Sequence, residues 1–554
     1  MSEKAFIQII LPLKLAWEPY YAVEQGQEAR VGDRVKVRFA HREYIGVVSA
    51  VGVDPAASKV DTSGVKTAAV VEELPRVSTR EIKFWRKLSE YYLCTVGEVF
   101  KAACPADRKV VRKPKKKSQF AGETEVPEIV LSPSSEAAVK EIREAFKCGK
   151  TALLKGEGRT ELYLSLARDV LREGRSVLLL VPEIALSRQV EERVKEVFPS
   201  LRTYHSEITP AAKRLVAREV REGAGMVIGT RSALFLPFRD LGLIIVDQEE
   251  APSFKQDSPA PRYGARESSI MLAAIHGANV LLGSATPSLE TLYNSDNKLF
   301  ARADINQSFT PETTLINTAA EVRKNGMSGS FSLRLLALMR KALGAGGKVL
   351  LVCRSKASVP ETEEEIGAIF PGEGIELIGP AGIRTLEGTY SLVGVLQADG
   401  ILGKEDFRSD EHTLQLLQQL RGHCRDCLAI QTREPRHPVF RALAEGADAM
   451  AFLEERRAFG YPPFRRLVKV VVRDGDANRL LTHTEMLSRR LGQALGDAVQ
   501  GPLETREEDT REILVFLPRN RELHRNKLTL YKTVEAFELE YHSTSRITID
   551  VDPV

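Results

Sequence analysis

The spacing of apolar and polar side chains changes several times along the chain, and each change marks a predicted domain. Residues 34–51 alternate apolar with polar positions and are rich in β-branched residues, which predicts strands of a small barrel. Residues 77–103 repeat apolar positions at helical spacing and stop before Pro105, which predicts helix. We therefore expect a β-rich N-terminal domain with a helical segment over residues 1–105.

Short apolar runs dominate the middle of the chain, and each is followed by a polar loop and an amphipathic stretch. Over 129–310 this alternation predicts βα units, hence a parallel sheet covered by helices. Chemistry in such folds lies at the carboxyl ends of the strands. The same pattern, weaker, over 311–440 predicts a second and smaller α/β lobe. The polar turns that follow the first five runs are GEGRT (156–160), PEIAL (182–186), GTRS (229–232), DQEE (247–250) and GSATPS (283–288).

The two remaining segments differ in composition. Residues 441–554 mix strand and helix patterns, which predicts a compact α+β domain. Residues 106–128 are rich in Lys and Arg and contain proline, which is typical of a linker. Such a charge run is usually solvated, and its alternative role is contact with a DNA backbone through Lys115, Lys116 and Lys117.

The overall composition is that of an ordinary soluble protein and excludes few classes of function. The 554 residues are 43% hydrophobic and 28% charged, and the net charge of +4 is too small to establish a nucleic-acid partner by itself. There is no apolar leader with a cleavage site and no apolar run of about 18 residues. We therefore expect a cytoplasmic protein without a membrane partner. Of six cysteines only Cys424 and Cys427 form a CxxC pair, so no zinc site is expected.

Two of the polar turns resemble incomplete phosphate and magnesium motifs. Arg159 follows Gly156 by three positions, whereas a phosphate-binding loop places a lysine about six positions after its first glycine. Asp247 ends an apolar strand, but the next residue is Gln248, an amide that cannot accept a proton from water. Taken alone, the first turn is explained by a glycine turn between strand and helix, but its position before a strand that ends in Asp247 favours a former phosphate site. Such a turn still offers N–H donors to an anion.

Longer segments then show a resemblance to a known family. The chain resembles the PriA family of primosomal replication-restart helicases over nearly its whole length and in the family's order. The segments that carry this resemblance are residues 11–23 (LPLKLAWEPYYAV), 180–187 (LVPEIALS), 229–238 (GTRSALFLPF), 262–266 (RYGAR), 283–291 (GSATPSLET), 455–464 (ERRAFGYPPF) and 549–553 (IDVDP).

The resemblance implies a fold and partners. It implies two RecA-like helicase lobes, the second one reduced, behind an N-terminal 3′-end DNA-binding domain and before the C-terminal α+β domain. It implies ATP and Mg²⁺ as cofactors, and DNA forks and single-stranded DNA as ligands. It also implies contacts with other primosome proteins, with replicative-helicase-loading proteins and with single-stranded-DNA-binding protein. A monomer is expected.

The resemblance also assigns residues. The nucleotide positions are Gly156, Gly158, Arg159, Thr160 and Asp247. For DNA it points to Thr230 and Arg231, and to Glu183 and Ser187 in the preceding strand-end loop, with a simple turn as the alternative in each case. Tyr20 and Tyr21 are expected to line a pocket for a 3′-terminal nucleotide, since aromatic faces stack bases; half-buried barrel tyrosines are the alternative.

The catalytic positions of the family are altered in this chain. Gln248 stands in the place of the general base, and His423 and Asp426 stand in the places of two arginines that stabilise phosphoryl charge. The family's zinc insertion and winged helix have no counterparts. We therefore predict a fork-binding restart protein without efficient ATP-driven unwinding. One alternative is an active 3′-to-5′ helicase in which Arg421 and Arg425 compensate, and another is an interaction module that no longer binds DNA.

Overall fold

The computed structural model describes most of the chain. The described residues are 6–54, 65–72, 74–104, 129–182, 188–223, 225–305, 310–372, 374–386, 388–402, 406–541 and 544–554. The basic segment that contains Lys115, Lys116 and Lys117 lies outside these ranges, as do Glu183 and Ser187. Among the described helices, none is long and apolar enough to cross a membrane.

The N-terminal domain is a closed five-stranded barrel followed by two helices. Strands alternate between its interior and solvent, so that Ile7, Ile9 and Val35 fill the barrel. The first helix begins at a capping box in which Ser78 and Glu81 bond each other's backbone amides. The elements are β1 (Phe6–Ile10), β2 (Tyr20–Val23), β3 (Arg34–Phe39), β4 (Arg42–Val51), β5 (Thr67–Val70), α1 (Thr79–Tyr92) and α2 (Val96–Ala103).

Lobe 1 is a seven-stranded parallel sheet in the order β12-β6-β11-β10-β7-β9-β8. Its central strands are buried on both faces, as continuous apolar runs require. The elements are α3 (Pro133–Lys147), β6 (Ala152–Lys155), α4 (Thr160–Arg172), β7 (Ser176–Leu180), α5 (Arg188–Val197), β8 (Arg202–Tyr204), α6 (Pro210–Glu222), β9 (Met226–Gly229), β10 (Leu241–Asp247), α7 (Ala265–His276), β11 (Asn279–Ser284), α8 (Leu289–Asp296) and β12 (Ala301–Asp304).

Lobe 2 is built around a smaller parallel sheet of five strands in the order β13-β19-β18-β16-β17. Two further helices, α13 and α14, follow its last strand. The elements are β13 (Glu312–Asn317), α9 (Thr318–Arg323), β14 (Met327–Ser328), β15 (Phe331–Ser332), α10 (Leu333–Gly344), β16 (Val349–Val352), α11 (Val359–Ile369), β17 (Ile375–Ile378), β18 (Tyr390–Val395), α12 (Ser409–Gly422), β19 (Cys424–Thr432), α13 (Pro438–Ala444) and α14 (Leu453–Phe459).

The C-terminal domain is a four-stranded antiparallel sheet in the order β21-β22-β20-β23, with two long helices. With the barrel and the two parallel lobes, it completes the predicted fold class. The elements are β20 (Arg465–Arg473), α15 (Ala477–Leu495), β21 (Val499–Glu504), β22 (Thr510–Pro518), α16 (Leu523–Glu540) and β23 (Arg546–Val551).

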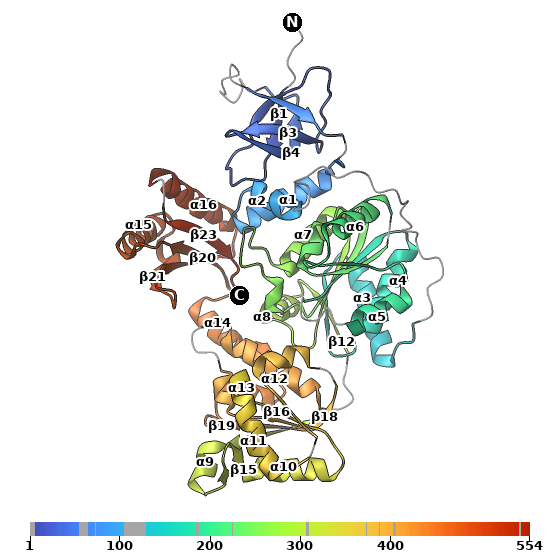
Figure 1. Cartoon of the computed structure of the whole chain (residues 1–554), viewed down its shortest axis with the longest axis vertical. Helices are drawn as coiled ribbons and strands as arrows, with labels where there is room; N and C mark the ends of the chain where they lie inside the picture. Colours follow the sequence, from blue (N-terminus) through green and yellow to red (C-terminus); the bar gives the residue numbers. More distant parts are fainter. Residues whose placement is uncertain are drawn as a thin grey trace.

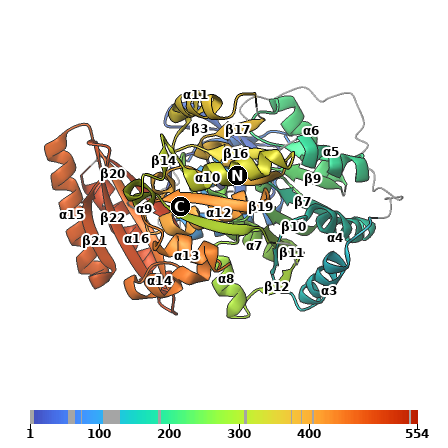
Figure 2. The same ribbon diagram turned by 90° about the horizontal axis from the view of Figure 1, so that it is seen from below.

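The barrel, lobe 1 and the C-terminal domain pack around the helices α1 and α2 of the N-terminal domain, whereas lobe 2 packs on lobe 1. Figure 1 shows α1 and α2 between the barrel and lobe 1, with the C-terminal domain to one side and lobe 2 at the opposite end from the barrel. The view from below also places the C-terminal domain beside the lobes (Figure 2). One buried apolar cluster contains Trp85 of α1, Ile244 of β10 and Val468 of β20. The N-terminal helices, one face of lobe 1 and the C-terminal domain therefore share a continuous core.

Candidate functional site

The turn between β6 and α4 carries the predicted nucleotide residues. Gly156 and Gly158 both have positive φ, which glycine adopts without steric cost. A Cβ at Gly156 would lie 2.6 Å from the carbonyl oxygen of Ile305, so the turn is packed closely against the end of β12. The amide of Gly156 donates a hydrogen bond to the carbonyl of Ser284, 3.0 Å away, and Thr160 begins α4.

Arg159 is bonded to the very carboxylate that the resemblance assigns to Mg²⁺. Its Nη2 lies 2.8 Å from Oδ1 of Asp247, and its Nε donates to the same oxygen at 2.9 Å. The hydroxyl of Tyr163 also donates to that oxygen, at 2.7 Å. Burial alone would lower the pKa of Arg159, but Asp247, together with Tyr163 and Glu157, raises it above its usual value. Burial, and then Asp247, raises the pKa of Tyr163 well above its usual value.

This arrangement does not fit a bound nucleotide with Mg²⁺. Oδ1 of Asp247 accepts from Arg159 and Tyr163, and Arg159 donates back to the Gly156 carbonyl of its own turn. Tyr163 occupies the space beside Gly283, where a Cβ would lie 1.7 Å from the tyrosine oxygen. The predicted residues Gly156, Arg159 and Asp247 are thus brought together, but as partners of one another.

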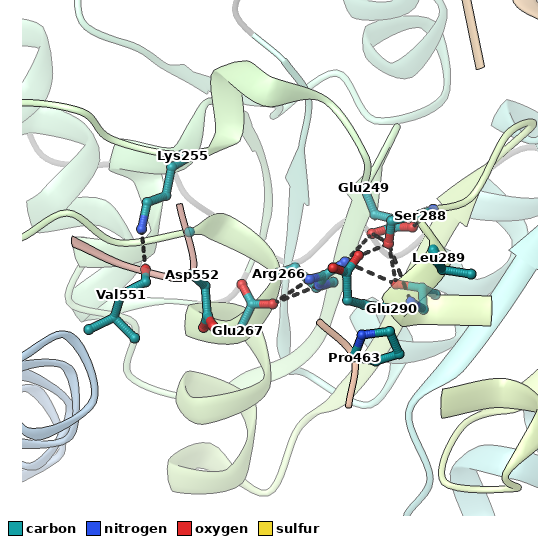
Figure 3. A network of polar contacts seen from close by, with 12 residues as sticks. Glu249, Lys255, Arg266, Glu267, Ser288, Leu289, Glu290, Pro463, Val551 and Asp552 are labelled. Atoms are coloured by element: carbon teal, nitrogen blue, oxygen red, sulfur yellow. Dashed lines mark hydrogen bonds and ion pairs between the residues drawn. The ribbon is translucent and has the colours of Figure 1, made fainter. Parts of the chain in front are cut away.

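The residues after Asp247 are held within lobe 1. Gln248 has a positive φ of 53°. Glu249 accepts from the amide of Ser288 at 2.7 Å and from Arg266 at 3.0 Å, a contact visible in Figure 3. Glu250 accepts from the hydroxyl of Thr286 at 3.2 Å, and burial, followed by the neighbouring Glu249, raises its pKa to about 8. A carboxyl that is protonated at neutral pH does not remove a proton from water.

The residues that replace the family's two arginines, and the nearby arginines that would compensate for them, make their contacts within lobe 2. His423 ends α12, and its Nδ1 lies 2.9 Å from the Gly388 carbonyl. Asp426 is paired with its neighbour Arg425 at 3.1 Å. Arg421, whose pKa burial lowers, donates to the carbonyl of Leu443 at 3.1 Å. None of these three contacts is with Arg159 or Asp247.

Two further predicted DNA contacts have structural partners. Thr230, at the end of β9, is 2% exposed, and its hydroxyl lies 3.4 Å from that of Ser232. Arg231 donates from Nη1 to the backbone carbonyls of Ser253 and Lys255, at 2.7 Å for the latter. Both residues thus support the strand-end turn that was the alternative interpretation.

A large cavity lies between the barrel, α1 and helix α16 of the C-terminal domain. It has a volume of about 790 Å³, and Tyr20 is part of its wall. Tyr21 is not: it is buried inside the barrel, and its hydroxyl donates to the Arg38 carbonyl at 3.1 Å. The expectation that both tyrosines line one pocket is corrected, because consecutive residues of a strand point to opposite faces.

Sequence reasoning missed most of this cavity's wall. Trp17 is 57% exposed in the wall, and the available signal was a tryptophan only three residues before Tyr20 in the sequence. The residues of α16 follow about 500 positions later, so no local spacing connects them with the barrel. The α16 residues in the wall are His524, Lys527, Leu528 and Tyr531.

The CxxC pair lies on β19. Cys424 is buried, and Cys427 lies 3.6 Å from the hydroxyl of Thr314. In the part of the chain that the structure describes, no three His, Cys, Asp or Glu side chains are grouped in a way that would hold a metal ion.

Comparison with known proteins agrees with this architecture. The family model of the PriA 3′ DNA-binding domain matches residues 8–105, and that of the DEAD/DEAH box helicases matches residues 135–295. Replication restart protein PriA of Rickettsia felis is 27% identical, covering 86% of this chain and 88% of that protein. The same protein of Haemophilus influenzae is 28% identical, covering 72% and 68%.

Two further comparisons carry less weight. Replication restart protein PriA of Chlamydia pneumoniae is 35% identical over 232 residues, which is 40% of this chain and 31% of that protein. The solved structure of RecG bound to a three-way DNA junction has a TM-score of 0.36 and carries no inference. The match to the PriA 3′ DNA-binding domain, the match to a helicase domain behind it and the PriA relatives aligned along most of the length together show that the chain belongs to the PriA family.

Proposed function

We propose that the protein binds forked DNA with a 3′ end and promotes replication restart by assembling other primosome proteins, without efficient ATP-driven unwinding. The observation that carries the proposal is the closed contact of Arg159 and Tyr163 with Asp247. Single-stranded-DNA-binding protein and replicative-helicase-loading proteins are the further partners that membership of the PriA family suggests.

The loss of ATP chemistry follows from what the side chains already bind. A phosphoryl-transfer site positions the phosphates with a flexible lysine, holds the metal with a carboxylate and neutralises developing charge with arginines. Here an arginine holds the carboxylate, and Gln248 follows it. Each missing donor typically lowers the rate by orders of magnitude, so we expect phosphate release near background.

The cavity beside the barrel fits the end of a DNA strand. Trp17, Tyr20 and Tyr531 supply aromatic faces, and stacking on such faces is worth about 1–3 kcal/mol per base. A 3′ terminus ends in an uncharged hydroxyl. The wall suits such an end because its charges balance.

That balance rests on four side chains of the wall. Arg86 lies 3.0 Å from the carboxylate of Glu18, and Lys527 donates to the backbone carbonyl of Glu90 at 3.1 Å, so these four side chains bring two positive and two negative formal charges to the wall. The volume of about 790 Å³ falls within the range of roughly 300–1,000 Å³ that is typical of ligand sites.

The experiment measures DNA binding and phosphate release on one purified sample. Three DNAs of equal length are compared: a fork with a 3′-hydroxyl in the nascent strand, the same fork with a 3′-phosphate, and plain duplex. We expect tightest binding to the 3′-hydroxyl fork and no DNA-stimulated release of phosphate from ATP. Equal affinity for fork and duplex would overturn the DNA part of the proposal. Phosphate release that Gln248→Ala abolishes would favour the helicase alternative.

The helicase alternative depends on compensating arginines. The contacts of Arg421 and Arg425 weaken it, since Arg421 donates to the Leu443 carbonyl and Arg425 to Ser391 and Asp426. The interaction module without DNA binding is tested separately. Neutralising Lys115, Lys116 and Lys117 without any change in salt-dependent DNA affinity would favour it.

A further inference from the structure

Lobe 2 contacts lobe 1 through helix α12, which lies against the polar turn after β11. Gln415 of α12 donates from Nε2 to the carbonyl oxygens of Thr286, at 3.1 Å, and Pro287, at 3.4 Å. One turn earlier, Glu411 accepts a hydrogen bond of 2.7 Å from the amide of Leu289. Leu289 is the first residue of α8, so a carboxylate of lobe 2 completes the N-terminus of a lobe 1 helix.

Buried charges extend this contact. Glu290 of lobe 1 forms an ion pair with Arg408, which precedes α12, with a nitrogen–oxygen distance of 2.7 Å, and lies 3.9 Å from Arg456 of α14. Arg456 in turn binds Glu411 at 2.6 Å, and both side chains are at most 3% exposed. Figure 3 shows Glu290 beside Arg266, Ser288 and Leu289 of its own lobe. We call the lobe 2 residues Arg408, Glu411, Gln415 and Arg456, with Glu290, the interlobe clasp.

The lobes also meet at the predicted nucleotide turn. Lys155, the last residue of β6, forms an ion pair of 2.9 Å with Asp448, which caps the short helix before α14. A Cβ at Gly422 of α12 would lie 2.8 Å from a carboxylate oxygen of Glu157 in the turn. The lobe 2 backbone therefore approaches this turn directly.

Little space is left between the lobes. Two cavities have walls formed by both lobes, with His412 and Gln415 in each wall, and each has a volume of about 70 Å³. Sites for small molecules usually span roughly 300–1,000 Å³. A nucleotide would therefore enter these cavities only after the lobes had separated.

We propose that the interlobe clasp joins the two lobes in this one arrangement whether or not nucleotide is present. Domain closure in other proteins is commonly driven by a ligand held between the closing parts. Here the side chains of the two lobes supply those contacts themselves. The net free energy of the clasp is small, because its charged groups would be hydrated if the lobes separated. The clasp therefore acts by fixing one orientation of the lobes. Removing one partner leaves a buried charge unpaired and weakens the contact between the lobes. The lobes then form a rigid support for the DNA-binding parts.

The amide of Leu289 reports directly on the clasp. The first amides of a helix have no intrahelical partner, and Leu289 finds its partner on Glu411 across the interface. The amide of Ser288 is bonded at 2.7 Å to Glu249 of the same lobe and is an internal control. Hydrogen exchange resolved to single amides in the full-length protein therefore distinguishes opening of the lobes from loosening of lobe 1.

We expect Leu289 to exchange equally slowly with and without Mg-ATP in the unsubstituted protein. Arg408→Gln should accelerate exchange at Leu289 by at least about tenfold and leave Ser288 unchanged. Gln415→Met removes interlobe hydrogen bonds without altering a charge, and serves if Arg408→Gln does not fold. The matched control is Arg441→Gln, because Arg441 pairs with Glu445 in an exposed position of α13.

Two results would overturn the proposal. One is a tenfold acceleration at Leu289 by Mg-ATP in the unsubstituted protein, and the other is unchanged exchange in both clasp variants. Neither result depends on the fork assay. Acceleration by Mg-ATP with phosphate release at background would overturn the clasp and leave the proposed function standing, whereas release with unchanged Leu289 would do the reverse.

Discussion

The turn at Arg159 and the cavity beside Tyr20 are two of the places where the chain was expected to meet a ligand, and they differ in how their polar groups are used. At the turn, Arg159 and Tyr163 are bonded to Asp247 within lobe 1. In the cavity, aromatic faces line about 790 Å³ of open space. A strand-to-helix turn can keep the backbone course of an ancestral site after its side chains have become one another's partners. The cavity keeps its ligand-sized space.

The largest expected effect tests whether water is excluded beside the Arg159 turn, at Glu250 in the neighbouring turn after β10. Glu250 has a pKa raised to about 8, first by burial, so the folded protein holds this proton more tightly than the unfolded chain does. Its contribution to stability is complete below about pH 4.5 and is lost as the pH rises to about 8. The loss is on the order of 3–5 kcal/mol. Glu250→Gln removes this titration, so the variant should gain stability relative to the unsubstituted protein across that window.

Urea unfolding at several pH values between 5 and 8 measures this gain. Glu454→Gln is the control, because the Glu454 side chain is 81% exposed. A stability difference that does not vary with pH would mean that water reaches Glu250, and the contrast between a closed turn and an open cavity would fail.

The next effect concerns the ion pair itself. Arg159→Met leaves Asp247 without its cation, and removing one partner of a buried pair costs about 3 kcal/mol or more in the free energy of unfolding. Phosphate release should stay at background. Arg193→Met is the control, since Arg193 pairs with Glu161 on the surface, where a pair is worth about 0–1 kcal/mol. Equal destabilisation by the two substitutions would show that Arg159 is not held as described.

The smallest expected effect concerns DNA binding in the cavity beside the barrel. Trp17→Ala should weaken binding to a fork with a 3′-hydroxyl by about 1–3 kcal/mol, roughly 5- to 150-fold, because one stacking face is lost. Fluorescence anisotropy measures the affinity. Phe459→Ala, an exposed aromatic residue of α14, should have no effect. If Trp17→Ala weakened binding to plain duplex equally, the cavity would not be the site of the DNA end.

Much of the fold follows from local patterns. Lys155, Gly229, Asp247 and Ser284 end parallel strands, so the alternation of apolar runs and polar turns predicts that they share one sheet edge. The unusual residues of the turn were also visible in the sequence. Their contact was not, since Arg159 reaches Asp247 across 88 positions and only the packed strand order decides that distance.

Thr230 and Tyr21, two of the residues predicted to contact DNA, are both buried. Tyr21 lies in β2 of the barrel, where consecutive side chains point to opposite faces, whereas Thr230 follows β9, which is buried along its whole length. A sequence motif predicts the course of the backbone, but it does not predict which of two neighbouring side chains faces solvent. The wall of the cavity is harder still to foresee, because Trp17 and Tyr531 are joined only by the docking of the C-terminal domain on α1.

That docking also has a consequence for biosynthesis. Tyr91 of α1 donates a hydrogen bond of 2.8 Å to Asp552, which follows it by 461 positions. A ribosome adds about 5–20 residues per second, so roughly 20–90 s pass between the synthesis of α1 and that of the C-terminal sheet that covers its apolar side. During that interval the first domain has a barrel but an incomplete core. The newly made N-terminus is therefore a stretch on which a chaperone would be expected to act before the last strands arrive.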